Sequence, residues 1–135
     1  MMRRMWCLAA LAGSVALATP AAATGGFACE ATDRDVTFAV NGATARDEGG
    51  GIVQADGNIE IKGGPQAAFD RTHIAQYWND ARSFRMIVSV HLTGSESILF
   101  QINAKGRGDW TYSGSYTVQA GKIKRSGRIT CDARG

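Results

Sequence analysis

Apolar and polar side chains alternate along the segment from Asp109 to Cys131, and this pattern constrains the fold more strongly than any other. Apolar residues stand at positions 110, 112, 116 and 118, while Thr, Ser and Gln occupy most of the positions between them. A period of two is what a β-strand with one buried face requires. A Gln-Ala-Gly-Lys connection then leads into a second run that ends at Cys131, so a hairpin is predicted. We expect its buried face to carry the aromatic side chains Trp110, Tyr112 and Tyr116.

Shorter alternating segments recur along the rest of the chain. They cover residues 27–31, 36–40, 59–61 and 98–102, while 84–92 is a long alternating segment and 52–53 begins another short strand. Between them, Asn41-Gly42 and Asp56-Gly57 predict tight hairpin turns, because both positions of each pair tolerate the positive φ of such turns. Turn signals at intervals of about eight to twelve residues are typical of all-β proteins. The sequence therefore predicts an antiparallel β-sandwich or a small barrel of about eight strands.

Residues 63–83 fit two different structures. Four apolar residues within 74–81 have the i, i+3, i+4, i+7 spacing of one helix face, which would place a short helix within 66–80. The alternative is a hairpin whose first arm is 72–78 and whose second arm is the long alternating segment that begins at Phe84. We favour the hairpin, because Thr, Ile, Tyr and Trp suit a pleated surface.

The first 23 residues have the three-part order of a secretory signal peptide. Arg3 and Arg4 give a positive start, an apolar run of about 14 residues follows, and Ala21-Ala22-Ala23 supplies the small residues of a cleavage site. A membrane-spanning helix needs a longer run, of about 20 residues. We therefore expect residues 1–23 to be removed and residues 24–135 to form a single β domain with no transmembrane segment. The protein is expected to be periplasmic or secreted.

Two cysteines remain once that leader is removed, Cys29 near the start of the domain and Cys131 near its end. An even number of cysteines in an oxidising compartment favours a disulfide. The pair lacks the Cys-x-x-Cys spacing of redox-active sites, which favours a structural role. The bridge is expected to join the first strand to the last.

Charge is divided unevenly along the domain. Without Arg3 and Arg4, 13 basic and 12 acidic residues remain, so the net charge falls from +3 to +1 and nucleic-acid binding is not expected. Residues 24–104 carry six basic and ten acidic side chains, whereas residues 105–135 carry seven basic and two acidic ones. The basic segment favours an unknown acidic protein or an anionic envelope polymer as partner. The alternative is that these charges face the acidic first part of the chain across the sheet and only set strand order.

An aromatic pair adds to this candidate contact surface. Neighbouring side chains in a strand point to opposite faces, so one of Tyr77 and Trp78 is expected to be exposed. The candidate contact surface combines this pair with four basic residues: Tyr77, Trp78, Lys122, Lys124, Arg125 and Arg128.

Catalytic and metal-binding signals are sparse. The two histidines, His73 and His91, stand in no nucleophile or zinc-protease motif. Asp70-x-x-His73 is the nearest approach to a metal-ligand pair, but a protein site needs at least a third ligand. The sequence predicts no catalytic residue, no metal and no cofactor.

These observations favour a small exported, non-catalytic binding module of the cell envelope that engages its partner through a sheet face and loops. Two alternatives stay open. The first is an enzyme or metal-dependent protein that uses His73 and His91, which requires the two histidines to converge. The second is a lipid or small-molecule carrier, which requires a barrel with an open interior, lined by Phe84, Met86, Phe100 and Trp110.

Overall fold

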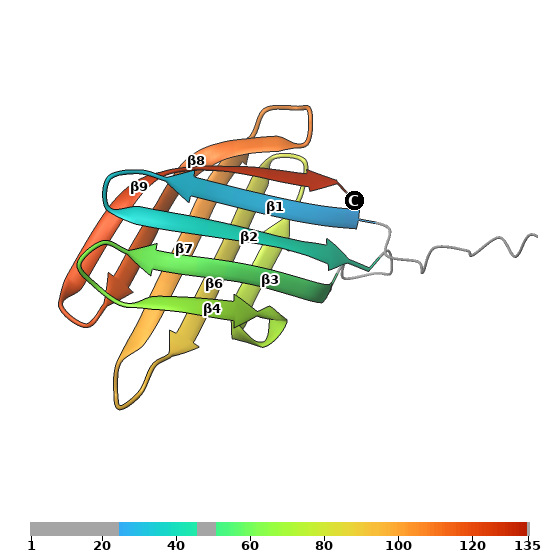
Figure 1. The fold of residues 1–135 in the computed structure, drawn as a ribbon. Coiled ribbons are helices and arrows are strands. Elements are labelled where there is room, and N and C mark those ends of the chain that lie inside the picture. The colour runs from blue at the N-terminus through green and yellow to red at the C-terminus, as the bar shows by residue number, and fades with distance from the viewer. Residues whose placement is uncertain (1–24, 46–50, 135) are drawn as a thin grey trace, which may run out of the picture.

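In the part of the chain that the structure describes, nine antiparallel strands form a single sheet that curls into a nearly closed barrel (Figure 1). The computed structural model describes residues 25–45 and 51–134, so the predicted signal peptide lies outside the described residues. A 3-10 turn, η1, separates the fourth strand from the fifth. The elements are β1 (Gly25–Thr32), β2 (Val36–Thr44), β3 (Ile52–Ile61), β4 (Gln66–Asp70), η1 (Arg71–His73), β5 (Ile74–Asn79), β6 (Ser83–His91), β7 (Ser97–Gly106), β8 (Thr111–Ala120) and β9 (Ile123–Arg134).

The order of the strands in the sheet is β4-β3-β2-β1-β9-β8-β7-β6-β5. The first and last strands of the chain are therefore neighbours in the middle of the sheet, and its two edges, β4 and β5, are joined through η1. Figure 1 shows β1 to β4 as one layer that crosses β6 to β8 steeply. β9 belongs to both layers, since its end pairs with β1 over 130–134 while 123–132 pairs with β8. A strongly twisted sheet closes around one core in this way.

Apolar side chains fill the interior of the barrel. Phe84, Met86 and Phe100 are fully buried. The ring of Phe38 stacks on that of Phe100 with 3.9 Å between the centroids, and on that of Phe69 with 5.8 Å. The alternation predicted for β6 and β7 is confirmed. A carrier would need some of these side chains to line an open cavity, whereas here they pack against one another.

The two dipeptides predicted to be tight turns lie inside strands, so that prediction was wrong. Asn41 pairs with Asp56, and Gly42 pairs with Ala55, within the β2–β3 ladder. A Cβ at Gly42 would overlap the ring of Phe27, and one at Gly57 would overlap the ring of Phe69. Both positions are glycine because an aromatic ring lies directly over the backbone of the strand. Glycine in a sheet can therefore make room for a ring and does not always mark a turn.

The hairpin favoured for residues 72–92 is confirmed. β5 pairs with β6, with Tyr77 opposite Met86 and Trp78 opposite Arg85. Only η1 remains of the helical alternative. The helical spacing arises because an irregularity in the register between Ile74 and Gln76 leaves Ile74 and Tyr77, three residues apart, both half-buried.

A disulfide joins Cys29 to Cys131, as predicted, across 102 residues of chain. The two residues are directly opposite each other in the β1–β9 ladder, and both are buried. The bridge therefore connects the first and last strands where the two halves of the sheet meet.

Two buried tyrosines tie β8 to turns elsewhere in the chain. The hydroxyl of Tyr112 lies 2.7 Å from Asn79 Oδ1 and 2.8 Å from the carbonyl oxygen of Asp80, in the β5–β6 turn. The hydroxyl of Tyr116 donates to Asp33 Oδ2, in the β1–β2 turn. Burial, and then this bond to a carboxylate, raise the pKa of Tyr116.

Asp33 is the acceptor of three hydrogen bonds. The backbone N–H groups of Asp35 and Val36 donate to its Oδ1, at 2.8 and 2.9 Å. Burial works against its charged form, but the bonds from Tyr116 and these two N–H groups outweigh burial, so the pKa of Asp33 is lowered. The charged carboxylate is thus part of how the β1–β2 turn is held against β8.

Tyr116→Phe is expected to lower the free energy of unfolding by about 1–2 kcal/mol at neutral pH, because a partly solvated hydrogen bond to a carboxylate is lost. Asp33 has a lowered pKa in the folded protein, so its stabilisation is complete above the ordinary value of 3.8 and is lost as the pH falls through the folded-state value. The difference in the free energy of unfolding between wild type and variant should therefore be smaller at about pH 3 than at neutral pH. Urea unfolding at both pH values measures it, and an unchanged difference would contradict the role given to the charged carboxylate.

Candidate functional site: the outer face of β5 to β9

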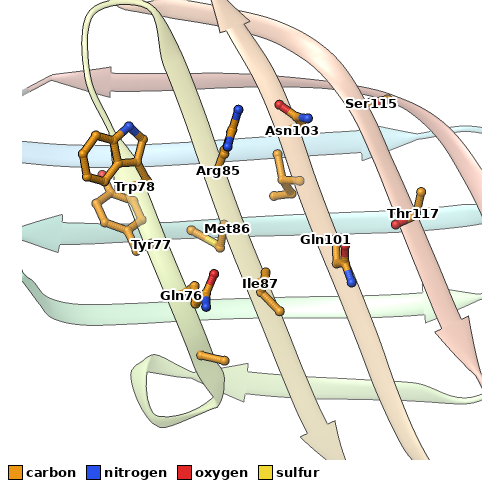
Figure 2. A pocket seen from close by; sticks show the side chains of 12 residues that line it. Gln76, Tyr77, Trp78, Arg85, Met86, Ile87, Gln101, Asn103, Ser115 and Thr117 are labelled. Carbon is orange, nitrogen blue, oxygen red and sulfur yellow. The ribbon is translucent and has the colours of Figure 1, made fainter.

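A row of polar and aromatic side chains crosses the outer face of five neighbouring strands. The register pairs Trp78 with Arg85, Arg85 with Asn103, Asn103 with Ser115 and Ser115 with Arg128. The alternating core positions of these strands, such as Met86 and Tyr116, are buried, so this row faces outward. We call these five residues the first row. Figure 2 shows its members on β5 to β8 together.

A second row lies beside the first on the same face. It consists of Gln76, Ile87, Gln101, Thr117 and Ser126, one from each strand in register. The two rows border an open groove of about 940 Å³ over β5 to β8 (Figure 2). Neither row contains a carboxylate, and the side chains between Arg85 and Arg128 are uncharged hydrogen-bonding groups. The groove therefore contains one positive charge, that of Arg85, and is polar along its length, while Arg128 adds a second positive charge beyond it on β9.

Trp78 is the most exposed large apolar side chain among the described residues, with 60% of its surface accessible. Its indole N–H donates to Asp80 Oδ2 at 3.1 Å. The other oxygen of Asp80 accepts from the N–H groups of Arg82 and Ser83, at 2.7 and 2.8 Å. These backbone bonds, ahead of the bond from Trp78, lower the pKa of Asp80. A charged turn residue thus holds the indole in one orientation.

The neighbour of Trp78 points the other way, as predicted. Tyr77 packs inside the barrel, with its ring centroid 5.2 Å from that of Phe27 and 5.5 Å from that of Phe84. Tyr77 therefore has its ring on the inner side of β5, and Trp78 is the exposed member of the pair.

The four basic residues predicted for the contact surface are divided by the structure. Arg128 belongs to the first row, and Lys124 lies on the same outer face, opposite Gln119. Lys122 stands in the turn between β8 and β9. Arg125 is opposite the buried Val118, so it has the inward direction, and its Nη1 donates to the carbonyl of Lys124 at 3.0 Å. The expectation that Arg125 adds to the outer face is thus wrong, because β9 alternates strictly.

Trp110 does not lie in the core, contrary to prediction. It precedes β8 and has a φ of 64°, and 49% of its surface is exposed. Its carbonyl accepts the N–H of Ala133 at 3.0 Å. The turn therefore ends at Trp110, and the alternation that places Tyr112 and Tyr116 inside begins only at Thr111.

In the described part of the chain, the basic residues of the outer face form no ion pair. Within residues 25–45 and 51–134 the structure shows one ion-pair contact, between Asp70 and His73, and none that involves a lysine or an arginine. The alternative in which these charges serve to pair the two parts of the sheet thus finds no support in the contacts of Arg85, Lys124 or Arg128.

The structure shows what surrounds each of the two histidines. Asp70 caps η1, because its Oδ1 accepts the Thr72 N–H at 2.8 Å while its own N–H donates to His73 Nδ1 at 3.1 Å. The contact between His73 Nδ1 and Asp70 Oδ1, at 3.2 Å, belongs to the same capping box. His91 is exposed at the end of β6. In the described part of the chain no three His, Cys, Asp or Glu side chains are placed to hold a metal ion together.

Arg85, Asn103, Gln76, Gln101 and Thr117 were not identified from the sequence. Their polar character on alternate positions was visible, but which of them become neighbours depends on the register between strands.

Comparison with family models, with characterised proteins and with solved structures found no match for this chain. Across the described residues, no helix has the length and apolar character to cross a membrane.

Proposed function

We propose that this protein is a small exported binding module that holds an anionic polymer of the cell envelope on the outer face of β5 to β9. The observation that supports it is the first row, in which Arg85 and Arg128 flank uncharged polar side chains and form no ion pair with a carboxylate of residues 25–45 or 51–134. Anionic groups of a partner are the counter-charges that such a surface lacks. Lys124 extends the positive charge along β9.

The groove has the form expected for a polymer. It is open and crosses several strands instead of closing around one small molecule. The polar groups that line it stand on rigid paired strands, so little ordering entropy is lost when a chain binds along them.

Arg85→Ala with Arg128→Ala is expected to weaken binding of polygalacturonate, a carboxylated polymer, by about twofold to thirtyfold. Each exposed ion pair contributes about 0.2–1 kcal/mol, and two are removed. Binding by the wild type should also weaken as salt rises from about 0.05 to about 0.5 M. Calorimetric titration of protein recovered from the periplasm of an expression host measures both effects. The mass of that protein shows whether residues 1–23 have been removed.

The control is Arg34→Ala with Lys62→Ala, which removes the same charge from two exposed turn positions that belong to neither row. It should leave the affinity within about twofold of wild type. If the control double variant weakens binding as much as the first, net charge and not this face attracts the polymer. If the wild type binds no anionic polymer, the proposed function is wrong.

A further inference from the structure

The indole of Trp78 offers a ligand only its ring face. Tryptophan has a single donor, the ring N–H, and Asp80 Oδ2 already accepts it at 3.1 Å. Asp80 is itself held by two backbone N–H groups of its turn. The ring is therefore both exposed and oriented before any ligand arrives, which lowers the entropy lost on binding.

Beyond Trp78, hydrogen-bonding side chains continue across the neighbouring strands on the same face of the sheet. Arg85 is the next member of the first row, and Asn103 and Ser115 follow on β7 and β8. Gln76, Gln101 and Thr117 run parallel in the second row. Strands lie about 4.8 Å apart, so Trp78 and Arg128, four strand steps apart, are separated by roughly 19 Å. A ligand that uses the whole row is an extended chain.

This inference rests on the proposed function. We propose that the polymer is an acidic polysaccharide. One of its sugar rings stacks on Trp78, and carboxylates of the polysaccharide pair with Arg85 and Arg128. A pyranose ring combines an apolar C–H face, which suits an indole face, with a rim of hydroxyls, which suits amide and hydroxyl side chains. Arg binds a carboxylate through two parallel hydrogen bonds. A polypeptide of acidic residues or a polyphosphate supplies the charge but no ring for Trp78.

The test uses Trp78 as its own reporter. Trp110→Phe leaves Trp78 as the single tryptophan of residues 24–135. This variant is titrated with polygalacturonate, with polyglutamate as an anionic polymer without sugars, and with dextran as a neutral sugar polymer. We expect the Trp78 emission to change with polygalacturonate and to stay unchanged with polyglutamate, and dextran to bind more weakly than polygalacturonate.

Trp78→Ala should raise the dissociation constant for polygalacturonate about tenfold or more, because a rigid aromatic anchor is lost. Trp110→Ala, which removes a tryptophan of similar exposure outside the two rows, should leave it within about twofold. Melting temperatures of both variants should lie close to that of the wild type, because about half or more of each side chain is exposed.

The outcomes separate the two proposals. If polygalacturonate and polyglutamate bind equally well and Trp78→Ala changes neither affinity, the anionic-polymer function stands and the sugar assignment is overturned. If no polyanion binds, both are overturned. If dextran binds as tightly as polygalacturonate, the ligand is a neutral polysaccharide and the roles of Arg85 and Arg128 are wrong.

Discussion

Removal of the disulfide by Cys29→Ala with Cys131→Ala is expected to lower the free energy of unfolding by about 2–5 kcal/mol. The bridge joins residues 102 apart in the chain, and in the chain-entropy model a closed loop of about 100 residues stabilises by up to about 4.7 kcal/mol. Both cysteines are also buried and opposite each other on β1 and β9. Their loss therefore acts where the two ends of the chain meet.

Urea unfolding of three samples measures this effect: oxidised wild type, wild type with reductant, and the double variant. Reductant should destabilise the wild type to about the level of the variant and should leave the variant unchanged. Stability of a domain this size is about 5–15 kcal/mol, so the expected loss is a large part of it. A double variant within about 1 kcal/mol of the oxidised wild type would show that strand pairing alone holds β1 to β9.

Phe38→Ala is expected to cost about 3–5 kcal/mol, because it removes a large side chain from a site that cannot collapse. The ring of Phe38 is fully buried and lies between Phe100 on one side and Phe69 on the other. It thus connects the layer of β2 and β4 with that of β7 through the centre of the barrel. Thermal and urea unfolding both report the loss.

Two further variants serve as controls for Phe38→Ala. Phe38→Leu retains most of the volume and should cost clearly less than the alanine variant. Val53→Ala, at a side chain that is 48% exposed, should stay within about 0.5 kcal/mol of wild type. A nearly neutral Phe38→Ala would mean that the interior is loosely filled, and it would favour the carrier alternative over a binding module.

The parts of the fold that were predicted correctly depend on local side-chain direction. Phe84, Met86 and Phe100 were assigned to one face because a strand alternates its side chains whatever its neighbours are. Cys29 and Cys131 were paired because only two cysteines remain in the domain. The errors arose where one residue type serves two purposes. Glycine at 42 and 57 makes room for the rings of Phe27 and Phe69 and does not make a turn.

The candidate site was only half visible in the sequence. Trp78 could be identified as one of an alternating aromatic pair, and Arg128 as part of a basic segment, but nothing local related the two. Arg85 was not identified, because nothing in its own segment of sequence shows which strands lie beside it. Arg125 was grouped with Lys124 and Arg128 although it lies on the other side of the same strand, and Trp110 was counted in a strand that begins only after it.

The sequence by itself determined the β-class of this protein, its two-residue period and its covalent closure, because each depends on residue type and spacing along the chain. Only the tertiary structure decided which outward side chains form a surface. Trp78 and Arg128 are 50 residues apart in the chain, and they share one row because the register carries it through Arg85, Asn103 and Ser115. Register is a property of strand pairs, and no single strand contains it.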